Sequence, residues 1–154
     1  MKIAVFPGSF DPFTMAHKDL VDRALSLFDK IYIAIGVNSS KKGLMDFEIR
    51  KQAISSLYAG NAKIVVESFT GLTINYCKKV NAQFILRGLR NGTDLDFENA
   101  IAQNNLILAP EIETYFLVAR TGTAHISSTI VRDILANNGS VDSLVPSEVL
   151  KYIK

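Results

Sequence analysis

The sequence predicts an α/β fold: one domain over residues 1–154, built as a Rossmann-like, doubly wound parallel sheet of five strands with flanking helices. Apolar, strand-like runs alternate along the chain with stretches of helical spacing, a pattern typical of right-handed βαβ units. The length of 154 residues matches one domain. An apolar content of 48% and a charged content of 21% are those of a globular protein with a buried core.

The predicted strands are short apolar runs. The first, Ile3–Phe6, is continuously apolar and therefore reads as a buried strand. The other four strands are predicted at Ile31–Ile35, Lys63–Val66, Phe84–Leu86 and Thr114–Val118.

The predicted helices carry apolar residues at helical spacing. In the first, Lys18–Phe28, residues 20, 21, 24, 25 and 28 are apolar and share one face. Asp46 is a plausible N-cap of the second helix, and Pro146 suits the start of the last. These further helices are predicted at Phe47–Leu57, Leu72–Val80, Asp96–Leu108, Thr129–Ala136 and Ser147–Tyr152.

Composition excludes several classes of protein. The net charge of +2 is too mild to indicate a nucleic-acid partner. No apolar run approaches the ~20 residues of a membrane span, and no signal peptide precedes the strand that begins at Ile3. The single cysteine, Cys77, cannot form an intramolecular disulfide and is better explained as a buried structural thiol than as a nucleophile. We therefore expect a cytoplasmic protein with neither nucleic-acid nor membrane partners.

The segment Gly8–His17 lies where the first strand passes into the first helix. In an open α/β sheet, ligands bind outside the carboxyl ends of the strands. Gly8 allows the backbone to approach a ligand closely, and free amides at the start of a helix favour an anion. His17 falls in the first turns of that helix, within reach of the same anion. The loops Gly36–Gly43 and Arg87–Thr93 also follow strands and carry charge, so we expect them at the same edge.

Three further groups of residues could bind phosphate. Lys41 and Lys42 follow the second strand, although an isolated lysine pair is more often a solvated loop. Arg87 and Arg90 flank Gly88-Leu89 after the fourth strand, and the planar fork of arginine suits phosphate oxygens. The run Ser127-Ser128-Thr129 precedes the fifth helix; an N-cap needs only one hydroxyl, so the excess indicates an oxyanion ligand.

Together these segments resemble the signatures of the nucleotidyltransferase superfamily, in particular of the bacterial phosphopantetheine adenylyltransferase family. The matching motifs are Gly8–His17, Ser39–Lys42, Arg87–Arg90 and Ile126–Arg132, and they stand in the family's order over the whole chain. Ala16 replaces the usual glycine, and Gly43 replaces the usual proline, which could make its loop more mobile. Thr123-Ala124-His125 departs from the Trp-Ser-Phe type, and His125 on its own is better explained as a packing or surface residue.

The resemblance implies an enzyme that transfers AMP from ATP to 4′-phosphopantetheine, giving dephospho-coenzyme A and pyrophosphate in coenzyme A biosynthesis. Attack would be direct and in line, without a covalent enzyme intermediate. It also implies a homo-hexamer, with coenzyme A as a possible feedback ligand. The chain has two histidines and no zinc-type spacing, so no metal ligand is predicted from the protein; Mg²⁺ would be carried by the ATP phosphates.

The resemblance also assigns residue roles. The catalytic residues would be His17, Lys41 and Arg90, with His17 and Lys41 at the α-phosphate and Arg90 with Ser128 at the departing pyrophosphate. The phosphopantetheine-binding residues would be Ser9, Lys41, Thr73 and Arg87. The ATP-binding residues would be Ser9, Phe10, His17, Gly88, Leu89, Arg90, Glu98, Thr123, Ala124, His125, Ile126, Ser127, Ser128 and Thr129.

Two alternatives stay open from the sequence. One is another adenylyl- or cytidylyltransferase of the superfamily, which would share the histidine and Ile126–Arg132 motifs but act on a different acceptor. The other is a non-catalytic nucleotide-binding module, which would form no product and would tolerate the loss of His17.

Overall fold

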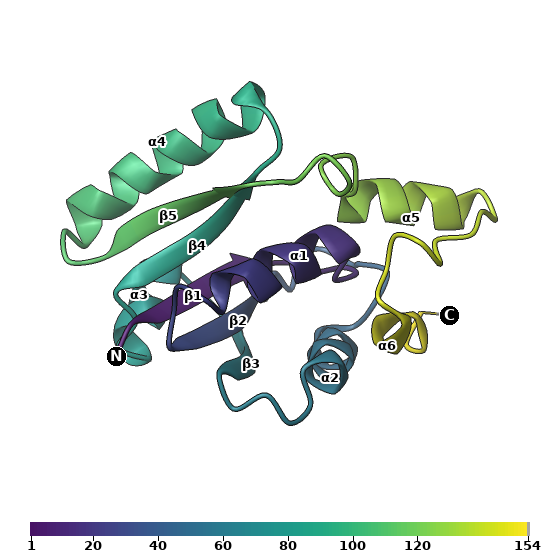
Figure 1. Cartoon of the computed structure of the whole chain (residues 1–154), viewed down its shortest axis with the longest axis horizontal. Helices are drawn as coiled ribbons and strands as arrows, with labels where there is room; N and C mark the ends of the chain where they lie inside the picture. The colour runs from purple at the N-terminus through teal and green to yellow at the C-terminus, as the bar shows by residue number, and fades with distance from the viewer. Residues whose placement is uncertain (154) are drawn as a thin grey trace.

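The computed structural model describes residues 1–153 and contains a five-stranded sheet in the order β3-β2-β1-β4-β5 (Figure 1). All neighbouring strands run parallel. The strands are β1 (Ile3–Gly8), β2 (Lys30–Gly36), β3 (Ile64–Phe69), β4 (Phe84–Leu89) and β5 (Glu113–Val118). The predicted doubly wound, Rossmann-like fold is confirmed.

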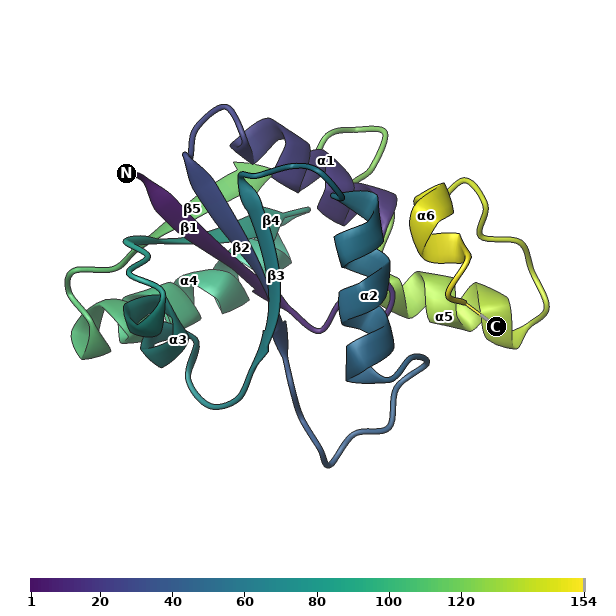
Figure 2. The same ribbon diagram turned by 90° about the horizontal axis from the view of Figure 1, so that it is seen from below.

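Helices cover both faces of this sheet (Figure 2). The helices α1 (Met15–Ala24), α2 (Phe47–Leu57), α5 (Ser128–Ala136) and α6 (Ser147–Leu150) contribute to one hydrophobic core. On the opposite face lie α3 (Thr73–Lys79) and α4 (Gly92–Leu108), and α3 supplies a second, smaller core. Cys77 of α3 is fully buried there, and burial raises the pKa of its thiol to about 12.

Two inner strands, β1 and β2, explain why apolar runs in the sequence predicted strands. In β1, Ala4 and Val5 are fully buried, and in β2 the same holds for Ile31, Ile33 and Ile35. A parallel strand covered by helices on both faces is apolar at successive positions rather than alternating.

No helix within residues 1–153 has both the length and the hydropathy required to cross a lipid bilayer.

Several predicted boundaries were wrong, among them the end of β3, which is Phe69 rather than Val66, and capping explains the two helix starts. Helix α1 begins at Met15 rather than Lys18, because Thr14 is its N-cap, and it ends at Ala24 rather than Phe28. Helix α4 begins at Gly92 rather than Asp96, because the Asn91 side chain accepts a hydrogen bond from the Asp94 amide. Strand β4 continues to Leu89, so the first part of the predicted loop Arg87–Thr93 is strand. Asp46 precedes α2 as predicted but makes no side-chain capping bond.

Candidate active site

A cavity of about 270 Å³ lies at the carboxyl ends of β1 and β4. These two strands flank the point where the strand order reverses, which is where open α/β sheets bind ligands. The cavity is lined by residues of four separate parts of the chain: Phe6, Pro7, Gly8, Ser9, Phe10, His17, Leu20, Arg87, Gly88, Leu89, Arg90, Asp94, Glu98, Ala119, Ile126, Ser127 and Ser128. The fold therefore assembles motifs that lie far apart in the sequence.

A capping box fixes His17 at the wall of this cavity. The Thr14 amide donates a hydrogen bond to Nδ1 of His17 at 2.9 Å, and the His17 amide donates to the Thr14 hydroxyl at 3.4 Å. Because Nδ1 accepts a backbone proton, the ring proton of the neutral imidazole is on Nε2. The rings of Phe10 and Phe13 pack 5.0 Å and 5.2 Å from the imidazole between centroids.

The surroundings of His17 also keep it uncharged. Burial is the largest cause, and the positive charges of Arg87 and Arg90 act in the same direction, so the pKa of His17 is lowered to about 3. At neutral pH the side chain is therefore a neutral imidazole with one donor, Nε2–H. It can stabilise developing negative charge by hydrogen bonding without adding a full positive charge.

Arg87 lines the same cavity and is held firmly by hydrogen bonds. Its Nε and Nη2 donate to the Glu98 carboxylate at 3.0 Å and 2.6 Å, and its Nη1 donates to the Pro7 carbonyl at 2.6 Å. Such two-point pairing of guanidinium and carboxylate is both strong and directional. Arg87 and Glu98 therefore form one unit that ties β4 to α4 and to the end of β1.

Arg90 forms a second, more exposed pair. Its Nε and Nη2 lie 3.0 Å and 3.2 Å from the Asp94 carboxylate, which also accepts from the Arg90 amide at 3.0 Å. The hydrogen bond to Asp94 raises the pKa of Arg90, and the bond to Arg90 lowers the pKa of Asp94. Asp94 received no role from the sequence; the only signal was its position four residues after Arg90.

The hydroxyls at the start of α5 have distinct partners. Ser127 is the N-cap and accepts from the Ile130 amide at 3.2 Å. Ser128 donates to the Pro12 carbonyl at 2.8 Å, and Thr129 accepts from Arg132 at 3.2 Å. Part of the excess of hydroxyls is thus explained by contacts within the protein, while Ser127 and Ser128 still line the cavity.

A second cavity, of about 400 Å³, adjoins the first because Ser9 lines both. It is bordered by Lys41, Lys42 and Gly43 of the loop after β2. A Cβ atom at Gly43 would overlap both the Arg50 guanidinium and the Asp11 carboxylate, so the loop backbone passes directly over these two side chains. The glycine that departs from the family pattern thus has a packing role here.

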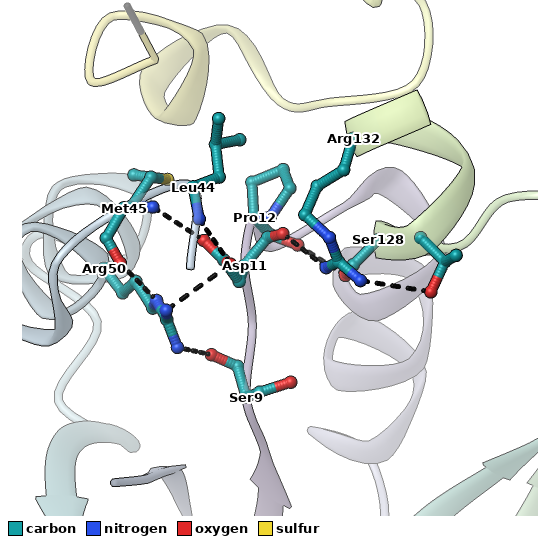
Figure 3. A network of polar contacts seen from close by, with 9 residues as sticks. Ser9, Asp11, Pro12, Leu44, Met45, Arg50, Ser128 and Arg132 are labelled. Carbon is teal, nitrogen blue, oxygen red and sulfur yellow. Dashed lines mark hydrogen bonds and ion pairs between the residues drawn. The ribbon is translucent and has the colours of Figure 1, made fainter. Parts of the chain in front are cut away.

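Asp11, Arg50 and Arg132 line this second cavity and belong to one polar network (Figure 3). Asp11 and Arg50 are only 5% and 4% exposed, and the Asp11 carboxylate lies 3.4 Å from Nη2 of Arg50. Sequence reasoning missed this network. Arg132 ends the recognised motif Ile126–Arg132, but Arg50 lies within α2, where no local pattern distinguishes a buried arginine from a solvated one.

Comparison with known proteins identifies the family of this chain. Residues 5–134 match the cytidylyltransferase-like family. A phosphopantetheine adenylyltransferase of Christiangramia forsetii is 51% identical, over 98% of this chain and 99% of its own length. The chain belongs to the phosphopantetheine adenylyltransferase family. A second member, from Flavobacterium psychrophilum, is 50% identical over 97% of this chain and 98% of its own.

A solved structure from Vibrio parahaemolyticus, provisionally assigned as a nicotinate-nucleotide adenylyltransferase, shares the fold of this family member. Its TM-score is 0.71, with 19% identity, and the match covers 99% of both chains. The resemblance inferred from the motifs is therefore confirmed at the level of family and fold.

The structure gathers most, but not all, of the residues to which the phosphopantetheine adenylyltransferase resemblance assigned roles. The first cavity is lined by eleven of them: Ser9, Phe10, His17, Arg87, Gly88, Leu89, Arg90, Glu98, Ile126, Ser127 and Ser128. Lys41 lines the second cavity. Thr73, Thr123, Ala124, His125 and Thr129 line neither of these two cavities, and their assigned roles stay predictions.

The state of His17 gives a testable pH dependence for this family member. Because the folded-state pKa is about 3, we expect no inflection near pH 6.5 in a plot of kcat against pH from 5 to 8. An inflection that disappears in His17→Asn would contradict this assignment.

The unfolded chain binds a proton at His17 below about pH 6.5 that the folded chain does not. His17 therefore lowers the stability as pH falls from about 6.5 towards 3 and has no such effect at higher pH.

Proposed function

We propose that this chain transfers the adenylyl group of ATP to 4′-phosphopantetheine, forming dephospho-coenzyme A and releasing pyrophosphate. The observation that carries this proposal is the meeting of His17, Arg90 and Ser128 in one cavity at the reversal of strand order. Relatives at 51% and 50% identity over nearly the whole chain carry the name of this activity.

The proposed mechanism is positioning and charge neutralisation. The acceptor phosphate attacks the α-phosphorus of ATP directly, so no protein nucleophile takes part and pyrophosphate leaves on the opposite side. The Nε2–H of His17 donates to an α-phosphate oxygen as charge develops, and Lys41 neutralises the same group. Arg90 and Ser128 hold the departing pyrophosphate. Ser9, Lys41, Thr73 and Arg87 hold the acceptor.

We propose that Mg²⁺ enters this site as a companion of the nucleotide. Within residues 1–153, no three His, Cys, Asp or Glu side chains are grouped as metal ligands. Asp94 and Glu98, which line the first cavity, are each paired with an arginine. We therefore propose that Mg²⁺ is held mainly by the ATP phosphates, where it would neutralise negative charge, and that Asp94 and Glu98 orient the arginines instead.

One assay tests the proposed function. The protein is incubated with MgATP and 4′-phosphopantetheine, and the product is identified by mass. We expect dephospho-coenzyme A and an equal amount of pyrophosphate. Parallel reactions with nicotinamide mononucleotide or glycerol 3-phosphate should release far less pyrophosphate. Equal or greater turnover of either acceptor would place the chain with a different activity of the superfamily, and nucleotide binding without product would indicate a binding module.

The two arginines of the first cavity should have separable roles. We expect Arg87→Ala to raise the KM for 4′-phosphopantetheine by at least about tenfold, the effect of losing one charged hydrogen bond. Arg90→Ala should mainly lower kcat and raise the KM for ATP. Glu98→Gln tests whether Arg87 needs its partner, and it should reproduce part of the Arg87→Ala effect. Steady-state kinetics with each substrate varied in turn decides; identical profiles for the two arginine variants would reject the division.

Assembly and location are proposed from the resemblance. We propose a homo-oligomer, with a hexamer as the expected state. Helix α4 supports self-association, because five of its six large apolar residues are exposed in the single chain: Leu95, Phe97, Ile101, Ile107 and Leu108. Light scattering of an active preparation should give the hexamer mass, and a monomer at micromolar concentration would contradict it. Two further predictions rest on the resemblance. The protein is expected in the cytoplasm, where ATP is available, and coenzyme A is expected to bind as a feedback ligand.

A further inference from the structure

The segment between β1 and α1 is held by side chains from two other elements, at three of its backbone carbonyls (Figure 3). Nη1 of Arg50, from α2, donates to the Ser9 carbonyl at 3.0 Å. Nη1 of Arg132, from α5, donates to the Asp11 carbonyl at 2.8 Å, and the Ser128 hydroxyl donates to the Pro12 carbonyl at 2.8 Å. The segment that carries Ser9 is therefore fixed from outside rather than by its own turn.

The Asp11 side chain extends this network to the Lys41 loop. Its two carboxylate oxygens accept hydrogen bonds from the amides of Leu44 and Met45, at 2.8 Å and 2.9 Å. Arg50 completes the connection, because its Nε donates to the Met45 carbonyl at 2.9 Å while its Nη1 reaches Ser9. The Asp11–Arg50 pair thus bonds both to the backbone that carries Ser9 and to the backbone that follows Lys41.

The pair has little capacity left for a ligand. Both side chains are about 95% buried, since Asp11 is 5% exposed and Arg50 is 4% exposed. A buried ion pair is weak evidence for stability, because desolvation offsets much of the attraction. Its geometric effect is clearer here: the carboxylate and guanidinium set the distance between two segments, and the Gly43 backbone lies so close that a methyl group would not fit.

We propose that Asp11 and Arg50 are positioning residues that set the spacing between Ser9 and Lys41, and thereby shape the binding site of the acceptor phosphate. The inference rests on the proposed function, in which Ser9 and Lys41 bind 4′-phosphopantetheine. Ser9 is also assigned to ATP and Lys41 to the α-phosphate, but His17, Arg90 and the start of α5 hold the nucleotide without this pair. Disturbing the pair should therefore affect the acceptor KM more than the KM for ATP.

Two variants weaken the pair in different ways. Asp11→Asn keeps the shape of the side chain, but its NH2 group cannot accept a hydrogen bond. One of the two backbone amides, of Leu44 or Met45, then loses its acceptor. Arg50→Lys keeps the charge but lacks the fork that reaches Ser9 and Met45 together. We expect each to raise the KM for 4′-phosphopantetheine by about tenfold or more, with the KM for ATP changed by less than about threefold, as for a small misplacement of a binding group.

The double variant Asp11→Asn with Arg50→Met separates positioning from folding, because it leaves no unpaired buried charge. Its unfolding midpoint should lie above that of Arg50→Met alone, while the acceptor KM stays raised. The matched control is Glu111→Gln, which removes an exposed ion pair with Lys78 outside both cavities and should leave both KM values unchanged.

Amide hydrogen exchange gives a readout that needs no activity. Leu44 and Met45 amides should exchange faster in Asp11→Asn than in Glu111→Gln, with the core strands unchanged. Equal shifts in both KM values, an acceptor KM that returns to wild type in the double variant, or unchanged exchange at Leu44 and Met45 would each overturn the inference. A wild-type protein inactive on 4′-phosphopantetheine would instead reject the proposed function, and exchange would then decide whether the pair fixes the loop.

Discussion

Replacing His17 with alanine should lower kcat by about 10²–10³-fold while ATP binding changes by less than about tenfold. The imidazole is neutral because burial, Arg87 and Arg90 lower its pKa to about 3, and the Thr14 amide bond to Nδ1 leaves the proton on Nε2. A donor placed at the α-phosphate binds the transition state more strongly than bound ATP, because negative charge builds during transfer. Its loss therefore affects kcat more than KM.

The structure also sets the controls for this experiment. His17 packs against Phe10 and Phe13, so the unfolding midpoint of His17→Ala must be measured to show that the loss of rate is not a loss of fold. Lys18→Ala is the matched control, because Lys18 is the next residue of α1, pairs with Asp22 and lines neither cavity. A folded His17→Ala enzyme that keeps more than about a fifth of the wild-type kcat, well short of the loss of such a donor, would exclude His17 as that donor.

Much of the fold could be predicted because the sheet is parallel and covered on both faces. Buried strands such as β1 and β2 appear in the sequence as unbroken apolar runs, so their positions were predicted to within a few residues. Helix starts were harder. The start of α1 depends on reciprocal hydrogen bonds between Thr14 and His17, and a histidine stands where the usual capping box has Glu or Gln, so the sequence pattern did not predict this start.

The candidate site was predictable where motifs follow strands, and not where it depends on partners distant in sequence. Arg87 and Glu98 were both assigned to the site, but their direct pairing needs β4 and α4 to lie side by side. The Asp11–Arg50 pair joins residues 39 positions apart and leaves no local pattern, since a charged residue within a helix usually faces solvent. A buried charge becomes visible only when the packing around it is known.

That burial leads to the second large effect, on stability. Replacing Arg50 with methionine should lower the free energy of unfolding by about 3–5 kcal/mol, because it leaves the Asp11 carboxylate buried without its counter-charge. The Leu44 and Met45 amides still donate to the carboxylate, but the Ser9 carbonyl loses its donor from α2. Methionine keeps a flexible apolar stem that packs well, so loss of the guanidinium's charge and of its hydrogen bonds to the Ser9 and Met45 carbonyls causes most of the effect.

Denaturant unfolding at neutral pH measures this change against an exposed pair of the same kind. Lys78 and Glu111 lie 3.6 Å apart with side chains 49% and 61% exposed, so Lys78→Met should change the free energy of unfolding by only about 0–1 kcal/mol. Adding Asp11→Asn to Arg50→Met should restore part of the loss, because the remaining charge is removed. If Arg50→Met were no less stable than Lys78→Met, another positive charge or water would have to neutralise the Asp11 carboxylate. The ion pair would then not be what holds Ser9 beside the Lys41 loop.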